Sequence, residues 1–168
     1  MKDFRILFVY PNTGSGYSFH PSIQLLSALA KQKGYETRLL HLHEKYGLPN
    51  DPSVLIPMAK DYNPNIIAFT STDFEYTWVE ELVGKMKEAM PDVFFLLGGK
   101  SAIEGKDLMK SNFDAFCVGE AEIPFMELLD AMKNGRDFSG ISSMWFKTGG
   151  VIVKNPLGEL FTDLDSLP

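Results

Sequence analysis

Two short apolar segments that each stop at glycine constrain this chain more than any other feature. Residues 93–99 read VFFLLGG, and residues 114–122 read DAFCVGEAE. A short continuous apolar run predicts a strand that is buried on both faces, as in a parallel sheet. Ligands of open parallel sheets bind beyond the carboxyl ends of the strands, where glycine leaves room for a ligand or for another stretch of backbone. The sequence therefore predicts two glycine-lined strand ends at one edge of a sheet.

Apolar runs and helical patterns alternate along the rest of the chain. Further strands are predicted at residues 4–10, 35–42 and 66–70. Helices are predicted to begin near Pro21, Asp51, Thr72, Ser101 and Pro124, the fourth of them spanning residues 101–110. This alternation indicates an α/β fold with a doubly wound, five-stranded parallel sheet of the flavodoxin-like or Rossmann-like type, and we expect the strand order 2-1-3-4-5.

The C-terminal part has a different pattern. Residues 143–147 and 151–154 flank a Thr-Gly-Gly turn, which predicts a β-hairpin. Residues 156–168 show no periodicity. We therefore expect an α/β domain over residues 1–140, a hairpin extension over residues 141–155, and a linker over residues 156–168.

Composition limits the class of protein. The chain has 168 residues, of which 45% are hydrophobic and 23% charged, enough for one domain with a full core. No apolar run approaches the roughly 20 residues of a membrane span. The start shows no signal-peptide pattern, and the single cysteine cannot form an internal disulfide, so we expect a cytoplasmic setting. The net charge of −6 argues against a nucleic-acid partner.

Glycines and hydroxyls follow neighbouring predicted strands. Gly98 and Gly99 leave space for a ligand tail, and the amides that follow them at Ser101 and Ala102 are expected to face a phosphate. The alternative is that the two glycines only end the strand tightly. After the preceding strand, residues 70–72 offer three hydroxyls; one of them is expected to cap the next helix, and the others could donate to a ligand.

Other reactive residue types favour structural interpretations. Glu120 and Glu122 stand at a helix start, where the helix dipole favours carboxylates without any ligand. His41 and His43 are expected to face the same way on a polar edge strand, without enough neighbours for a zinc site. Cys117 is expected to pack in the core. The sequence has no P-loop, GxSxG or HExxH motif, and Phe19 interrupts a potential GxGxxG fingerprint.

Taken together, these pieces resemble the cobalamin-binding domain of cobalamin-dependent radical SAM enzymes over nearly the whole chain. The resemblance rests on residues 10–12 (YPN), 63–71 (NPNIIAFTS), 97–99 (LGG), 117–122 (CVGEAE) and 164–168 (LDSLP). The whole enzyme resembles the anaerobic magnesium-protoporphyrin monomethyl ester oxidative cyclase type. In such enzymes the last segment leads into a radical SAM domain with a CxxxCxxC motif, which is absent here. The resemblance implies that this chain is the N-terminal module, and that the 4Fe–4S cluster and S-adenosylmethionine belong to a missing domain of the same full-length chain.

The resemblance implies a corrinoid across the carboxyl edge of the sheet, with its nucleotide tail running down between strands. The implied cofactor-binding residues are Asn12, Thr13, Tyr17, Phe19, Thr70, Ser71, Thr72, Gly98, Gly99, Lys100, Gly119 and Glu120. The loop after the first strand lacks the DxHxxG motif that supplies a cobalt ligand in many cobalamin domains, so we expect base-off binding without a histidine ligand from the protein. Thr13, Tyr17 and Phe19 are then candidates for the lower face of the corrin. We expect His20 to cap its helix or to meet solvent, because Pro21 holds its backbone extended.

Methyl transfer and oxidative ring closure are both outcomes that the resemblance allows in the parent enzyme, and the fragment alone is not expected to be catalytic. The alternative is a flavodoxin-like interaction or regulatory domain that binds no corrinoid. A phosphoacceptor domain is disfavoured because the first strand ends in Tyr10-Pro11 without an acidic pair. A flavin site is disfavoured because residues 12–18 depart from a phosphate-binding loop rich in threonine and serine.

Overall fold

A computed structural model describes residues 4–12, 20–43, 45, 47–103 and 106–168. Its sheet has seven strands in the order β2-β1-β3-β4-β5-β6-β7. The strands are β1 (Arg5–Pro11), β2 (Glu36–Leu42), β3 (Ile66–Thr70), β4 (Phe94–Gly98), β5 (Ala115–Cys117), β6 (Met144–Thr148) and β7 (Val151–Lys154). The helices are α1 (Pro21–Gln32), α2 (Pro52–Tyr62), α3 (Asp73–Ala89), α4 (Lys100–Ile103) and α5 (Glu122–Lys133).

The first five strands are parallel, and their expected order 2-1-3-4-5 is confirmed. The count of five is wrong, because β6 pairs antiparallel with β5 and extends the sheet through the predicted hairpin. With only three residues, β5 would be a short open edge, and such an edge leaves backbone groups unpaired. The hairpin extension is therefore part of the sheet and covers that edge.

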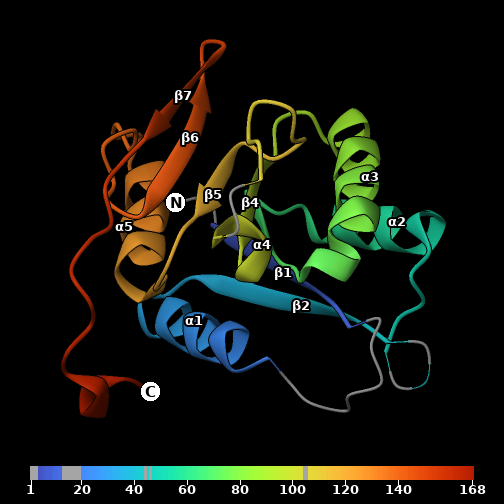
Figure 1. Cartoon of the computed structure of the whole chain (residues 1–168). Coiled ribbons are helices and arrows are strands. Elements are labelled where there is room, and N and C mark those ends of the chain that lie inside the picture. Colours follow the sequence, from blue (N-terminus) through green and yellow to red (C-terminus); the bar gives the residue numbers. More distant parts are fainter. Residues whose placement is uncertain (1–3, 13–19, 44, 46, 104–105) are drawn as a thin grey trace.

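Successive residues of the central strands point to opposite faces of the sheet, and helices cover both faces (Figure 1). On one face, Leu7, Ile67 and Phe95 pack in a core with buried residues of α2 and α3. On the other, Phe8, Ala68 and Leu96 pack in a core with buried residues of α1 and α5. The continuous apolar runs of β3 and β4 are thus explained, since both of their faces are buried.

The helix expected over residues 101–110 is much shorter, because α4 has only four residues. Farther on, the Asp107 side chain accepts from the Met109 N–H at 3.1 Å, and its carbonyl accepts from the Lys110 N–H at 3.0 Å. Aspartate side chains that bond nearby amides favour turns over helices. Ile103, Leu108 and Met109 therefore do not lie along one helix.

The segment after β7 lies against the body of the domain. The Ser143 N–H donates to the Pro156 carbonyl at 2.8 Å, and the Gly158 N–H donates to Ser143 Oγ at 2.9 Å. The Phe161 N–H donates to Glu120 Oε2 at 3.2 Å, and a single 3₁₀ turn, Leu164–Ser166, follows. Within the described residues, no helix has the length and apolar character needed to cross a bilayer.

Asp114 connects four elements at the amino end of β5. Its Oδ2 accepts from the buried Phe95 N–H at 2.8 Å, and its Oδ1 accepts from Lys87 Nζ in α3. Its own N–H donates to the Phe95 carbonyl at 2.9 Å, and its carbonyl accepts from the Lys147 N–H at 2.8 Å. The side chain and backbone of one residue thereby fix β4 and α3 against β5 and β6.

Replacing Asp114 with alanine is expected to lower the free energy of unfolding by about 2 kcal/mol, because the buried Phe95 N–H loses its acceptor. Urea denaturation followed by circular dichroism measures this change. Lys87→Ala is the control, since it removes only a partly exposed ion pair and is expected to cost less than about 1 kcal/mol. Equal losses in the two variants would contradict this account of Asp114.

Candidate functional site

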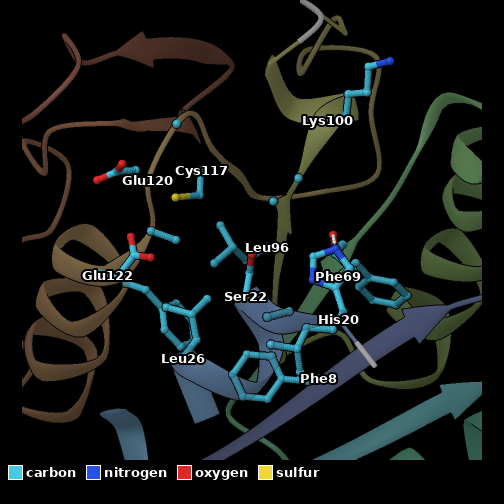
Figure 2. A pocket seen from close by; sticks show the side chains of 18 of the residues that line it. Phe8, His20, Ser22, Leu26, Phe69, Leu96, Lys100, Cys117, Glu120 and Glu122 are labelled. Carbon is cyan, nitrogen blue, oxygen red and sulfur yellow. Dashed lines mark hydrogen bonds between the residues drawn. The ribbon is translucent and has the colours of Figure 1, made fainter. Parts of the chain in front are cut away.

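A cavity of about 520 Å³ opens at the carboxyl edge of the sheet, between the strand ends and the helices α1 and α5. Figure 2 shows it from close by. Its inner walls are apolar, and its mouth carries polar and glycine residues. The lining residues used below are Phe8, His20, Leu26, Thr70, Gly98, Gly99, Lys100, Cys117, Gly119, Glu120, Glu122 and Phe125.

A second hollow of about 450 Å³ adjoins the first and shares His20 and Thr70 with it. It is lined further by Tyr10, Asn12, Ser71, Thr72, Phe74 and Glu75. The phenyl ring of Phe74 is fully exposed there. The two hollows together extend the concave surface from the end of β1 to the loop after β5.

The structure brings together all the implied binding residues that it describes. The larger cavity is lined by Thr70, Gly98, Gly99, Lys100, Gly119 and Glu120, and the smaller one by Asn12, Ser71 and Thr72. Thr13, Tyr17 and Phe19 lie outside the described residues. The clustering follows from the parallel topology, because every parallel strand delivers its carboxyl end to the same edge.

The two adjacent glycines have different environments. Gly99 has a φ of +82°, and a Cβ added there would lie 2.6 Å from Thr70 Oγ1. The turn after β4 therefore needs glycine for its backbone conformation and for its close approach to the end of β3. Gly98 has neither constraint, since an added Cβ would meet only the Phe69 carbonyl oxygen at 3.8 Å. The alternative that the glycines only end the strand tightly thus accounts for the glycine at position 99, but not for the one at position 98.

The three hydroxyl residues at positions 70–72 have different hydrogen-bond partners and therefore different roles. Thr72 donates both its N–H and its Oγ1–H to Glu75 Oε2, at 3.1 and 2.8 Å. The expected helix cap is thus confirmed, and it has the form of a capping box at the start of α3. Ser71 Oγ donates to the Thr72 carbonyl at 2.9 Å. Thr70 Oγ1 lies 3.3 Å from His20 Nε2 at the boundary of the two hollows.

The amides of Ser101 and Ala102 are not available to a phosphate, contrary to expectation. The Ser101 N–H donates to the Ser71 carbonyl, and the Ala102 N–H donates to the Gly99 carbonyl, both at 3.2 Å. The bond from Ser101 to Ser71 holds the short helix α4 against the end of β3, and the bond from Ala102 to Gly99 closes the turn of α4 itself. The backbone at this point therefore supports the cavity mouth.

His20 neither caps α1 nor points fully into solvent, which corrects the sequence-based expectation. Its side chain makes no capping hydrogen bond, and its half-buried ring packs edge-on to Tyr10 with centroids 5.2 Å apart. Burial lowers the pKa of His20 below its usual 6.5, and the charge of Glu75 opposes the shift. The ring is therefore neutral at pH 7. The backbone restriction imposed by Pro21 could not reveal these neighbours, which are distant in sequence.

His41 and His43 lie near the end of the edge strand β2. The His41 ring stacks on Tyr10 with centroids 5.1 Å apart, and the His41 and His43 rings lie 6.0 Å apart. The expected polar edge is only partly correct, because His43 is buried. Burial is also the main reason why the pKa of His41 is lowered. Among the described residues, no three His, Cys, Asp or Glu side chains are arranged to hold a metal ion.

Several cavity residues were not identified from the sequence as site residues. Phe8, Leu26 and Phe125 have the spacing of ordinary core residues, and nothing in that pattern marks a cavity wall. Cys117 is buried as expected, but its side chain also lines the cavity (Figure 2). Burial raises the pKa of its thiol to about 12, and the nearby Glu122 contributes to the same shift. The thiol is therefore protonated and unreactive at neutral pH.

Comparison with known proteins identifies the family of this chain. The B12 binding domain family matches residues 13–129. An uncharacterised methyltransferase of Pyrococcus horikoshii is 26% identical over 180 residues, covering 100% of this chain and 38% of that protein.

Two solved structures share the fold. The radical S-adenosylmethionine methyltransferase TsrM from Kitasatospora setae, with cobalamin and a 4Fe–4S cluster bound, matches with a TM-score of 0.78 and 17% identity over 99% of this chain and 31% of its own. The cobalamin-dependent S-adenosylmethionine radical enzyme OxsB, with aqua-cobalamin bound, matches with a TM-score of 0.76 and 13% identity over 95% of this chain and 23% of its own. The chain thus spans 23% to 38% of the length of the relatives described here.

Substituting the two glycines with alanine is expected to separate their roles in folding. Gly99→Ala should lower the free energy of unfolding by about 1–3 kcal/mol, because alanine is strained at positive φ and its Cβ would collide with Thr70. Gly98→Ala should change it by less than about 0.5 kcal/mol, because an added Cβ makes only ordinary contact. Chemical denaturation of the ligand-free variants measures both values, and equal losses would show that the cavity mouth needs both glycines structurally.

Proposed function

The chain belongs to the B12 binding domain family, and from this premise we propose that it is the cobalamin-binding module of a cobalamin-dependent radical SAM enzyme. The observation that carries the proposal is the cavity at the carboxyl edge of the sheet, where ligands of parallel α/β folds bind. Its volume of about 520 Å³ lies within the usual range of 300–1,000 Å³ for small-molecule sites.

The cavity residues fit the parts of a corrinoid. Phe8, Leu26 and Phe125 make an apolar inner wall suited to the aromatic base of the nucleotide tail. Gly98 keeps the passage beside β4 open, because a larger side chain there would enter the cavity. Thr70 offers a hydroxyl at the mouth. When bound, cobalamin supplies the cobalt chemistry used for methyl transfer or ring closure in the parent enzyme, and the protein's task is to bind and orient it.

We propose that residues 1–140, together with the hairpin of residues 141–155, form the cobalamin module, and that residues 156–168 lead to a radical SAM domain of the same chain. This domain would hold the 4Fe–4S cluster and S-adenosylmethionine. Support comes from the relatives, which are about three to four times longer than this chain and include two radical enzymes with cobalamin bound. The buried free thiol of Cys117 is consistent with a cytoplasmic location.

Methyl transfer is the parent reaction that the relatives favour. The Pyrococcus horikoshii relative is a methyltransferase by name, and TsrM is a radical methyltransferase. Oxidative ring closure, implied by the resemblance to the cyclase type, is the second candidate. The match to the B12 binding domain family speaks against the alternative of an interaction domain without a corrinoid.

We further propose that cobalamin binds base-off and without a histidine ligand from the described part of the chain. His20 is the nearest candidate, but its Nε2 lies 3.3 Å from Thr70 Oγ1 and its Nδ1 is buried. His41 Nε2 lies 3.3 Å from the Asn12 amide nitrogen, and His43 Nδ1 accepts from the Lys45 N–H at 3.1 Å. Each ring thus directs a nitrogen at a neighbouring protein group.

The purified chain is expected to retain hydroxocobalamin, and its red colour, after desalting. Gly98→Val should weaken binding by about 1–3 kcal/mol, which is roughly 5- to 150-fold in affinity, because the added methyl groups enter the cavity. Equilibrium binding followed by absorbance measures the affinity, and thermal denaturation shows whether the fold persists. Gly140→Val is the matched control, since an added Cβ there meets no atom within 4 Å. A wild-type chain that elutes colourless would overturn the proposed function.

His20→Ala is expected to leave the spectrum of the bound cofactor unchanged, because His20 Nε2 lies 3.3 Å from Thr70 Oγ1 and its Nδ1 is buried. Electron paramagnetic resonance of bound cob(II)alamin provides the measurement. We expect no nitrogen hyperfine splitting from an axial imidazole in the wild type, and none in His41→Ala or His43→Ala. Splitting that disappears only in His20→Ala would show that this ring turns away from Thr70 to bind cobalt.

A further inference from the structure

Glu122 presents an unusual carboxylate to the cavity. It is the first residue of α5 and lines the cavity beside Cys117 (Figure 2). Its Oε2 is buried and has no hydrogen-bond partner among the described residues. Glu120, two residues earlier at the same mouth, differs because its Oε2 accepts from the Phe161 N–H. The two acidic residues of this loop are therefore not equivalent.

No described residue provides Glu122 Oε2 with a hydrogen bond or pairs with its charge. The described ion pairs do not include Glu122. The neighbouring thiol of Cys117 stays neutral, because burial and the charge of Glu122 raise its pKa to about 12. The dipole of α5 favours a negative charge at this position, but it does not provide a hydrogen bond to Oε2. Buried carboxylate oxygens are normally hydrogen-bonded, and one that lacks a partner is unfavourable.

An unsatisfied acceptor on the wall of a ligand cavity indicates that the ligand brings the donor. Resting on the proposed function, we infer that Glu122 accepts a hydrogen bond from the nucleotide end of the corrinoid and selects for corrinoids that carry that donor. The donor is an O–H or N–H group, and it has two possible sources. One is a ribose hydroxyl, which every complete corrinoid carries. The other is a group on the lower base, such as the amino group of adenine, which dimethylbenzimidazole lacks.

Three ligands and one isosteric variant test this inference. Affinities are measured for cobinamide, which has no nucleotide, for hydroxocobalamin, and for pseudocobalamin, whose lower base is adenine. Glu122→Gln keeps the shape of the side chain but removes its charge. We expect this variant to bind at least one of the two complete corrinoids about tenfold more weakly than the wild type, because charge-assisted hydrogen bonds are about twice as strong as neutral ones. Binding of cobinamide should be unchanged.

The two sources of the donor give different patterns. Equal weakening of hydroxocobalamin and pseudocobalamin in Glu122→Gln identifies the ribose hydroxyl. Weakening confined to pseudocobalamin, together with its tighter binding to the wild type, identifies the donor on the base. Glu127→Gln is the matched control, because Glu127 lies on the same helix but is exposed and outside the cavity. It should bind all three ligands as the wild type does.

Two outcomes overturn the inference. In the first, Glu122→Gln binds both complete corrinoids as tightly as the wild type. In the second, it loses cobinamide to the same extent, which points to a general change in the fold; thermal denaturation of the ligand-free variant detects such a change independently. These failures are distinct from failure of the proposed function, in which the wild type binds no corrinoid at all.

Discussion

The close approach of Gly99 to the end of β3 sets the geometry of the carboxyl edge. Because glycine lacks a Cβ, the turn after β4 can lie against Thr70 and Ser71, and the Ser101 N–H can reach the Ser71 carbonyl. That contact directs the chain away from the sheet at the mouth of the cavity. Gly98 faces the cavity. Gly99 therefore shapes the mouth of the cavity, and Gly98 leaves the passage beside β4 open. Any bulkier residue at Gly99 would push apart the two strand ends that define the site.

The cavity exists because helices on one face of the sheet do not close over its carboxyl edge. Phe8, Ala68 and Leu96 belong to the core on the face of α1 and α5, and the same three side chains line the cavity. The inner wall is therefore a continuation of the hydrophobic core into a space that the protein leaves unfilled. A ligand with an apolar end can complete this core, while its polar portion meets the hydroxyls and carboxylates at the mouth. Folding and ligand binding thus use the same apolar surface.

The sequence predicted the elements that depend on local chemistry. Three features follow from local chemistry that acts over a few residues. They are the buried parallel strands, the hydroxyl cap at the start of α3 and the glycine-rich strand ends. Contacts between distant segments were not predictable in this way. The pairing of β6 with β5, the contact of His20 with Thr70, and the hydrogen bond from the Ser101 N–H to the Ser71 carbonyl join residues 27 or more positions apart. The sequence also could not identify Leu26 and similar apolar residues as part of the cavity wall. A core residue and a cavity residue have the same helical spacing.

Glu120 and Glu122 are two residues apart in one loop, but their carboxylates differ in hydrogen bonding. Both residues line the cavity, but Glu120 Oε2 also accepts from the tail that follows β7, whereas Glu122 Oε2 has no hydrogen-bond partner among the described residues. The tail supplies a backbone donor to Glu120, and Gly119 lies beside Leu157 of the same tail, with 3.6 Å between an added Cβ and Leu157 Cδ2. Glu122 receives no such donor from the described protein. Because both residues belong to one short loop, a ligand that bonds Glu122 would contact the same segment that binds the residues after β7.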